Sequence, residues 1–341
     1  MTSIPDDQLF KHADRVQGKV VIITGGANGI GKESALRFAS HGAKVIIGDS
    51  DVVRAQGVVS EILQSGGVAS FVATDVTKWD DQVALFEYAL GTYGSVDVVV
   101  PNAGIWELRH RDGFTSPQFK DGKPVPPSLR TLDVNLTGAL YTTNLALHYL
   151  FIGQKDGDLK SLVLIGSMAS WGGFSLGGEL YAASKHAILG LMRSLHRMLD
   201  KRGVRIACIC PFFTNTELVP TLVKAFLAGI PTPTVPRIAG AIFYAATDPD
   251  TETSGSAWLL ADDGPVFLVP KEKFKAGVYA MIDQRVNSIT KCVRGMGYCK
   301  RLLHDIWKLS GPLHKYALSA LILGVAWKNR AGVEAFTSNV R

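Results

Sequence analysis

The chain has 341 residues, of which 47% are hydrophobic and 19% are charged, so wholesale disorder is excluded and a substantial core is expected. Its net charge of +6 is unevenly spread, because residues 271–341 hold 13 Lys and Arg against 4 Asp and Glu. The first 270 residues are therefore close to neutral, and we expect no nucleic-acid partner.

From Lys19 onward, short apolar runs rich in β-branched residues alternate with helical segments. The first run, KVVIITG, ends at a glycine, and the next segment, GIGKESALRFASHG, is typical of a helix that stops at Gly42. Continuous apolar strands separated by helices indicate a parallel sheet covered on both faces, so we expect the α/β class with a Rossmann-type, doubly wound parallel sheet. Further strands are expected within residues 43–49, 68–75, 96–104, 161–167, 204–211 and 256–264.

Three segments fall outside this alternation. Residues 105–130 form a polar loop after a strand end, where open α/β sheets bind their ligands. Residues 212–240 mix a short amphipathic helix with prolines, as a substrate lid would, and the third segment is the basic tail. We expect an N-terminal arm at 1–15, a single domain at 16–270 and a helical C-terminal extension at 271–341.

The run TGGANGIG joins the first expected strand to the first expected helix. Its spaced glycines permit a tight turn, close approach of the backbone to a pyrophosphate and close packing of helix on strand. Phosphates would lie at the helix N-terminus, where free N–H groups and the helix dipole favour anions. The dinucleotide contacts expected in this turn are Gly25, Asn28, Gly29, Ile30 and Gly31.

An acidic residue ends the second expected strand. Asp49 lies 18 residues beyond Gly31, where a carboxylate accepts hydrogen bonds from the adenosine ribose and repels a 2′-phosphate. This residue favours NAD over NADP as the cofactor. The alternative is that Asp49 is a solvated turn residue before a helix.

Tyr181 and Lys185 lie one helical turn apart in the apolar run GGELYAASKHAILG, so their side chains share a face. Together with the glycine turn, several further motifs occur in the order of a known family: Asp75–Val76, Asn102–Gly104, Asn135, Ser167 and Y-x-x-x-K. On these motifs, residues 16–270 resemble a short-chain dehydrogenase/reductase. Within that family, YAASKHAILGLMRSL and GVRIACICPFFTNT are most similar to the NAD-dependent 15-hydroxyprostaglandin dehydrogenase branch.

The resemblance implies roles for the catalytic residues. Tyr181 would be the general base that takes the proton of an alcohol. A free phenol has a pKa of ~10, so Lys185 and the positive nicotinamide ring would be needed to stabilise the phenolate, and Lys185 would also bind the nicotinamide ribose. Ser167 would orient the substrate oxygen, with Ser170 as the alternative. Asn135 would anchor a water that links the lysine to solvent, or would instead pair with a neighbouring strand.

The resemblance also extends to the rest of the cofactor site and to the pocket. The other implied cofactor contacts are Asp75, Val76, Asn102, Gly104, Thr214 and Thr216. Phe212 stands where the family usually has glycine, which indicates a narrower, apolar pocket beside the nicotinamide. The side chains that would line this pocket are Trp106, Trp171, Phe174, Phe212, Phe213 and Leu218.

We therefore expect an NAD-dependent secondary-alcohol dehydrogenase for a hydrophobic small molecule. The alternatives are an NADP-dependent carbonyl reductase and a non-catalytic sensor or scaffold that binds a dinucleotide. The helix after Tyr181 carries an apolar stripe that predicts a homodimer or larger homo-oligomer, formed by Ile188, Leu191, Met192, Leu195 and Leu199.

The termini and the cysteines bear on location. The first residues carry acids and no apolar run, so they form no signal peptide, and the four cysteines have no zinc spacing, so no metal is expected. We expect reduced thiols in a cytoplasmic protein. The apolar run at 313–328 is too short to span a bilayer. The tail would either contact an anionic membrane peripherally or, as we favour, fold back beside the lid and close the pocket.

Overall fold

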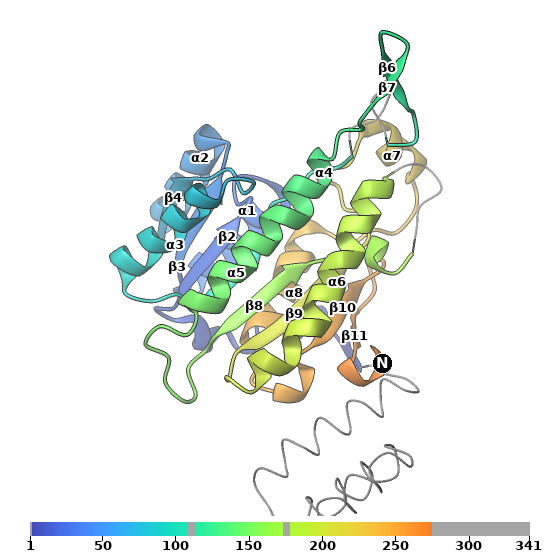
Figure 1. The fold of residues 1–341 in the computed structure, drawn as a ribbon. Coiled ribbons are helices and arrows are strands. Elements are labelled where there is room, and N and C mark those ends of the chain that lie inside the picture. The colour runs from blue at the N-terminus through green and yellow to red at the C-terminus, as the bar shows by residue number, and fades with distance from the viewer. Residues whose placement is uncertain (1, 108–113, 173–177, 275–341) are drawn as a thin grey trace, which may run out of the picture. The chain divides into compact units, whose positions relative to one another are not determined.

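One sheet organises the part of the chain that the structure describes, residues 2–107, 114–172 and 178–274 of a computed structural model (Figure 1). Within these residues nine strands are joined in the order β1-β11-β10-β9-β8-β5-β2-β3-β4. Neighbours from β4 to β10 run parallel, whereas β11 is antiparallel to β10 and β1 is antiparallel to β11. The strands are β1 (Thr2–Ile4), β2 (Val20–Thr24), β3 (Lys44–Asp49), β4 (Val68–Ala73), β5 (Val98–Pro101), β8 (Ser161–Ile165), β9 (Arg205–Pro211), β10 (Ser256–Leu260) and β11 (Val266–Val269).

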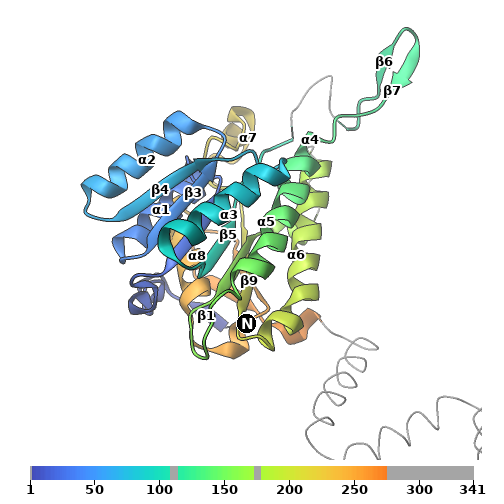
Figure 2. The ribbon, with the colours of Figure 1, turned by 60° about the vertical axis from the view of Figure 1, so that its left-hand side comes forward.

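Helices cover both faces of the sheet, as Figures 1 and 2 show. One apolar core joins α1, α2 and α8 to one face, and a second joins α3, α5 and α6 to the other. Every residue of β2, β5, β8 and β9 is buried, as expected for parallel strands covered on both sides. The predicted doubly wound parallel sheet is therefore confirmed. The main helices are α1 (Gly29–Ser40), α2 (Val52–Gln64), α3 (Trp79–Tyr93), α5 (Ala139–Tyr149), α6 (Glu179–Asp200), α7 (Thr221–Phe226) and α8 (Val235–Thr247).

One edge of the sheet differs from the sequence expectation. Strand β11 was not expected, and residues 1–15, set apart as an arm, contribute β1, which pairs Thr2 with Leu268. The side chains of Ile4 and Leu9 are buried in the core, and Asp6 forms an ion pair with Arg237 of α8 at 2.6 Å. The N-terminal residues thus pack as part of the sheet domain.

The 105–130 segment also contains structure that the sequence did not predict. Strands β6 (Gln118–Lys120) and β7 (Lys123–Val125) pair as an antiparallel hairpin that projects away from the body (Figures 1 and 2). Asp121 has a positive φ of 52° between them, followed by Gly122 at 74°, which is the geometry of a tight hairpin turn. Phe119 on this hairpin is 67% exposed.

Two sequence expectations concern membranes and metals. Among the described residues, no helix combines the length and apolarity needed to cross a bilayer. Over the same part of the chain, no group of three or more His, Cys, Asp or Glu side chains is placed to hold a metal ion. Cys208 and Cys210 are buried free thiols. Cys292, Cys299 and the tail beyond Phe274 lie outside the described residues.

Candidate active site

The carboxyl ends of the parallel strands border a cleft of about 580 Å³. It opens where β2 has β3 on one side and β5 on the other, which is the position at which doubly wound sheets bind ligands. The cleft brings together all of the predicted cofactor and catalytic residues except Asn135, which is buried and does not line it. These lining residues are Gly25, Asn28, Gly29, Ile30, Gly31, Asp49, Asp75, Val76, Asn102, Gly104, Ser167, Tyr181, Lys185, Thr214 and Thr216.

The glycine turn is closed against the chain that follows β5. A Cβ on Gly25 would lie 2.7 Å from the Ala103 Cα, and one on Gly31 would lie 2.1 Å from the Gly25 carbonyl oxygen. The Asn102 side chain fixes this approach by donating hydrogen bonds to the carbonyl oxygens of Thr24 at 3.0 Å and Gly25 at 2.9 Å. Only glycine fits at these two positions, so the turn offers bare backbone and the N-terminus of α1 to an anion.

The cleft beyond this turn is acidic. Asp49 ends β3, and its two carboxylate oxygens accept hydrogen bonds from the backbone N–H groups of Ala27 and Asp51, each at 2.9 Å. Asp49 is therefore held against the glycine turn and is not a freely solvated turn residue. Asp75 accepts two hydrogen bonds from Thr77, and these hold the pKa of the Asp75 carboxyl below its usual range.

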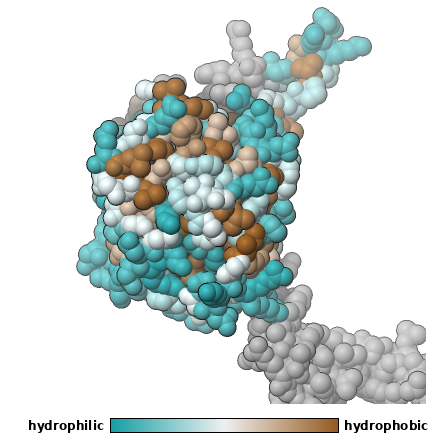
Figure 3. Space-filling model, turned by 90° about the vertical axis from the view of Figure 1, so that its left-hand side faces the viewer, coloured by the Kyte–Doolittle hydropathy of each residue, from teal (hydrophilic) through white to brown (hydrophobic). Residues whose placement is uncertain are grey.

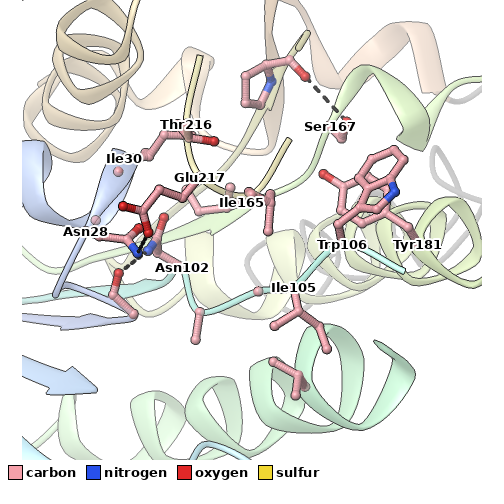
Figure 4. Close-up of a pocket in the computed structure, with 18 of the residues that line it drawn as sticks. Asn28, Ile30, Asn102, Ile105, Trp106, Ile165, Ser167, Tyr181, Thr216 and Glu217 are labelled. Carbon is pink, nitrogen blue, oxygen red and sulfur yellow. Dashed lines mark hydrogen bonds between the residues drawn. The ribbon is translucent and has the colours of Figure 1, made fainter. Parts of the chain in front are cut away.

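Ser167, Tyr181 and Lys185 meet at the other end of the cleft. Ser167 follows β8, and its hydroxyl donates to the carbonyl oxygen of Pro211 at 3.4 Å (Figure 4). Tyr181 is in the first turn of α6 and is 8% exposed. The Lys185 ammonium donates to the carbonyl oxygen of Ile165 at 2.9 Å and lies 5.6 Å from the centre of the Tyr181 ring.

Burial dominates the acid–base properties of this group. Burial raises the pKa of Tyr181, and the neighbouring Ser167 hydroxyl offsets this rise only in part. Burial also lowers the pKa of Lys185 to about 8. The Lys185 ammonium donates to a backbone carbonyl and lies beside the Tyr181 ring, so its role in lowering the pKa of the phenol stays a prediction.

The structure separates the two candidate serines. Ser167 lines the cleft, whereas the Ser170 hydroxyl donates to the Lys185 carbonyl at 2.7 Å and accepts from the Ser167 N–H at 3.2 Å. Ser170 thus joins the short turn after β8 to α6. Its hydroxyl is occupied in supporting Ser167 and Lys185.

Asn135 pairs with the chain after β5. It lies in a π-helical segment, Asp133–Gly138, and is 1% exposed. Its side-chain oxygen accepts from the Ile105 N–H at 2.8 Å, and its amide donates to the Ile105 carbonyl oxygen at 2.9 Å and to Ser184 at 3.5 Å. Asn135 thus pairs with the segment that follows β5, and its part in anchoring a water stays a prediction.

The catalytic end of the cleft is apolar. Four of the predicted pocket residues line it, namely Trp106, Phe212, Phe213 and Leu218. The Trp106 ring packs on Tyr181 with ring centroids 4.7 Å apart (Figure 4). It also packs on Phe213, with ring centroids 5.8 Å apart. Trp171 does not line the cleft; its ring packs on the Phe274 ring, with centroids 5.5 Å apart. Phe174 lies outside the described residues.

The first part of the expected lid crosses the cleft. Thr216 lies 3.5 Å from the position a Cβ on Gly29 would take, and Thr214 donates to the carbonyl oxygen of Pro233 at 3.0 Å. Glu217, which the sequence analysis did not single out, lines the cleft and pairs with Arg54 of α2 at 2.6 Å. No motif marked this pair, because its two members are far apart in the sequence.

The sequence of this chain is similar to those of known proteins. The sequence pattern of the short chain dehydrogenase family matches residues 19–225. The short-chain dehydrogenase/reductase ascJ of Acremonium egyptiacum is 32% identical over 265 residues, which cover 76% of this chain and 81% of that protein.

Solved structures show the same fold with either form of the cofactor. A 3-ketoacyl-(acyl-carrier-protein) reductase from Brucella melitensis, complexed with NADH, aligns with a TM-score of 0.63 and 29% identity over 73% of this chain and 98% of that one. A short chain dehydrogenase from Burkholderia cenocepacia J2315, in complex with NADP, aligns with a TM-score of 0.63 and 27% identity. The alignment covers 73% of this chain and 98% of that one.

Proposed function

This chain belongs to the short-chain dehydrogenase family, and we propose that it is an NAD-dependent dehydrogenase of hydrophobic secondary alcohols, with Tyr181 as the general base. Membership makes it an oxidoreductase that acts on alcohols or carbonyl compounds and uses NAD or NADP. The observation that carries the proposal is the single cleft with the glycine turn and Asp49 at one end and Ser167, Tyr181 and Lys185 at the other.

The residues present fit a dinucleotide. The glycine positions in which a Cβ would collide leave the backbone bare beside the N-terminus of α1, where a pyrophosphate is favoured. Asp49 would accept hydrogen bonds from the adenosine ribose and repel a 2′-phosphate, which supports NAD. Asp75, Val76, Asn102 and Gly104 would border the adenosine half, and Thr214, Thr216 and Lys185 the nicotinamide half. When bound, NAD supplies the hydride acceptor and, in its oxidised form, a positive ring.

The chain's own residues would handle the proton. Ser167 would donate a hydrogen bond to the substrate oxygen and fix its direction toward Tyr181. Tyr181 would then take the hydroxyl proton of an alcohol, or return it to a carbonyl oxygen in the reverse direction. Because burial raises the pKa of Tyr181, its phenolate requires nearby positive charge, and Lys185 is the cation of this end of the cleft.

The surroundings of Tyr181 support an apolar substrate. Trp106, Phe212, Phe213 and Leu218 leave few polar groups for a charged or sugar-like molecule. The sequence resemblance to the 15-hydroxyprostaglandin dehydrogenase branch adds prostanoid alcohols to this class. We further propose that the protein acts in the cytoplasm as a homo-oligomer, and that the tail beyond Phe274 either borders the substrate pocket or contacts a membrane surface.

A cofactor spectrum tests the function. The full-length protein is mixed with NAD or NADP and a panel of steroid, prostanoid, polyketide and terpenoid alcohols, and reduced nicotinamide is followed by its absorbance. Turnover of at least one alcohol with NAD is expected. Preferential NADP use would support a carbonyl reductase instead, and cofactor binding without turnover of any alcohol or ketone would support a sensor or scaffold.

A further inference from the structure

The helix that carries Tyr181 begins without a cap of its own. Gly178 occupies the N-cap position with a φ of 97° and provides no side chain. The first intrahelical bond runs from the Ala182 N–H to the Gly178 carbonyl at 2.8 Å, so the N–H groups of Glu179, Leu180 and Tyr181 lack helical partners. Free N–H groups at a buried helix start are costly and need acceptors from elsewhere in the fold.

The missing acceptor comes from the loop after β5. One carboxylate oxygen of Glu107 accepts the Leu180 N–H at 2.7 Å and the Tyr181 N–H at 3.3 Å. Glu107 is 7% exposed, and within the described residues it forms no ion pair with a basic side chain. Because one carboxylate oxygen accepts both N–H groups, the negative charge of Glu107 lies at the N-terminus of α6, where the helix dipole stabilises an anion.

The residue before Glu107 packs on the same helical turn. The Trp106 ring lies 4.7 Å from the Tyr181 ring, and a Cβ on Gly178 would come within 3.2 Å of Trp106. The two consecutive residues thus hold the first turn of α6 in two ways, one through its backbone N–H groups and the other through the Tyr181 ring. Glu107 lies outside the family motifs that this sequence contains.

We propose that Glu107 is a positioning residue, which replaces the absent N-cap of α6 and fixes Tyr181 relative to Ser167. The inference rests on the proposed role of Tyr181 as general base. Glu107 does not reach the reacting atoms and acts through the backbone of Tyr181. Through Glu107, the residues that directly follow β5 contribute to the placement of Tyr181.

Three variants of the full-length protein test this role. Glu107→Ala removes the acceptor, Glu107→Gln keeps an oxygen but removes the charge, and Glu179→Ala removes an exposed carboxylate from the same helical turn. We expect kcat to fall at least tenfold in Glu107→Ala and severalfold in Glu107→Gln, with the Kd for NAD within twofold of wild type. Glu179→Ala should leave both values unchanged.

Amide hydrogen exchange gives a readout that does not depend on turnover. In Glu107→Ala, exchange at Leu180 and Tyr181 should be at least tenfold faster than in wild type, while Glu179→Ala should show wild-type rates. Unchanged exchange in Glu107→Ala would overturn the proposal, as would a parallel loss of NAD affinity and kcat, which would make Glu107 merely structural. If wild type turns over no alcohol, the proposed function fails, and the exchange rates alone decide whether Glu107 caps the helix.

Discussion

The Lys185 ammonium donates its hydrogen bond to the carbonyl oxygen of Ile165, at 2.9 Å, and not to the phenol of Tyr181. Ile165 ends β8, so the lysine is anchored to the sheet directly beneath the turn that presents Ser167. One carbonyl does not replace the water lost on burial, which is why the pKa of Lys185 falls to about 8. Burial therefore imposes a free-energy penalty on the charged form of Lys185 in the folded protein.

This penalty predicts a pH dependence of stability. Between pH 8 and 10.5 the unfolded chain keeps the Lys185 proton while the folded protein has lost it, so stability rises with pH in this window, by at most on the order of 3 kcal/mol. Urea unfolding at pH 7 and pH 9.5 should show this gain in wild type and a smaller gain in Lys185→Met. Lys11→Met, at an exposed site, is the control. Equal slopes in wild type and Lys185→Met would contradict the low pKa.

The proposed base predicts a separation of chemistry from binding. Tyr181→Phe removes the hydroxyl that exchanges a proton with the substrate, while the glycine turn and Lys185 are left intact. We expect kcat to fall by a factor of at least 10² and the Kd for NAD to stay within a few-fold, measured by steady-state kinetics and fluorescence titration. Lys185→Ala should impair both quantities. A Tyr181→Phe variant with near-normal kcat would sink the mechanism.

The position of Asp49 predicts cofactor preference. Its carboxylate is fixed by two backbone N–H groups, so a 2′-phosphate would meet a negative charge that cannot swing away. Compared as kcat/KM, NAD should exceed NADP at least tenfold, which corresponds to ~1.4 kcal/mol. Asp49→Asn should narrow that ratio, whereas Asp51→Asn, outside the cleft lining, should not. A wild-type preference for NADP would overturn the assignment of NAD.

The central sheet and its cleft follow from local sequence signals. Each parallel strand is a continuous apolar run. The glycine turn, Asp49 and Ser167 come at or directly after strand ends, and Tyr181 lies in the first turn of the long helix that follows β8. Because parallel strands place their carboxyl ends at one edge, local motifs are enough to bring these residues together. The edge strands differ, because the pairing of Thr2 with Leu268 joins segments that carry no shared pattern.

The site details that the sequence did not give depend on the path of a loop. Glu107 reaches α6 because the chain after β5 turns toward it, and the Arg54–Glu217 pair exists because the lid crosses to α2. In each case the contact joins two segments that are far apart in the sequence, so it depends on the fold and cannot be predicted from local sequence patterns.

The surface of α5 and α6 predicts self-association. Of the apolar stripe on α6, Ile188, Met192 and Leu199 are buried in the protein's own core, so only Leu191 and Leu195 face outward. They border a groove of about 430 Å³ that is almost wholly apolar, with side chains from α3 and α5, and is lined by Trp79, Leu140, Tyr141, Thr143, Asn144, Leu147, Leu191 and Leu195. The α2 and α3 side, by contrast, exposes apolar side chains in separate patches among hydrophilic ones (Figure 3).

We expect a second copy of the chain to cover this groove. Light scattering at micromolar concentration should give at least a dimer for wild type, and Leu140→Asp should shift the mass toward the monomer because a charge would be buried in the contact. Val53→Asp on α2, where the side chain is 78% exposed, should change nothing. A monomeric mass for wild type at this concentration would contradict the prediction.

The tail beyond Phe274 predicts two different phenotypes on truncation. Phe274 itself belongs to the domain, since the Arg193 guanidinium lies 3.9 Å from the centre of its ring, so the chain is best cut after this residue. If the tail borders the substrate pocket, as we favour, the truncated protein should lose activity or several degrees of Tm in lipid-free buffer. If the tail contacts a membrane, the truncated protein should turn over a soluble substrate normally but no longer sediment with anionic vesicles, because each basic residue near such a surface contributes about 1 kcal/mol. Vesicles without anionic lipid are the control, and normal activity combined with lost sedimentation would show that the pocket assignment is wrong.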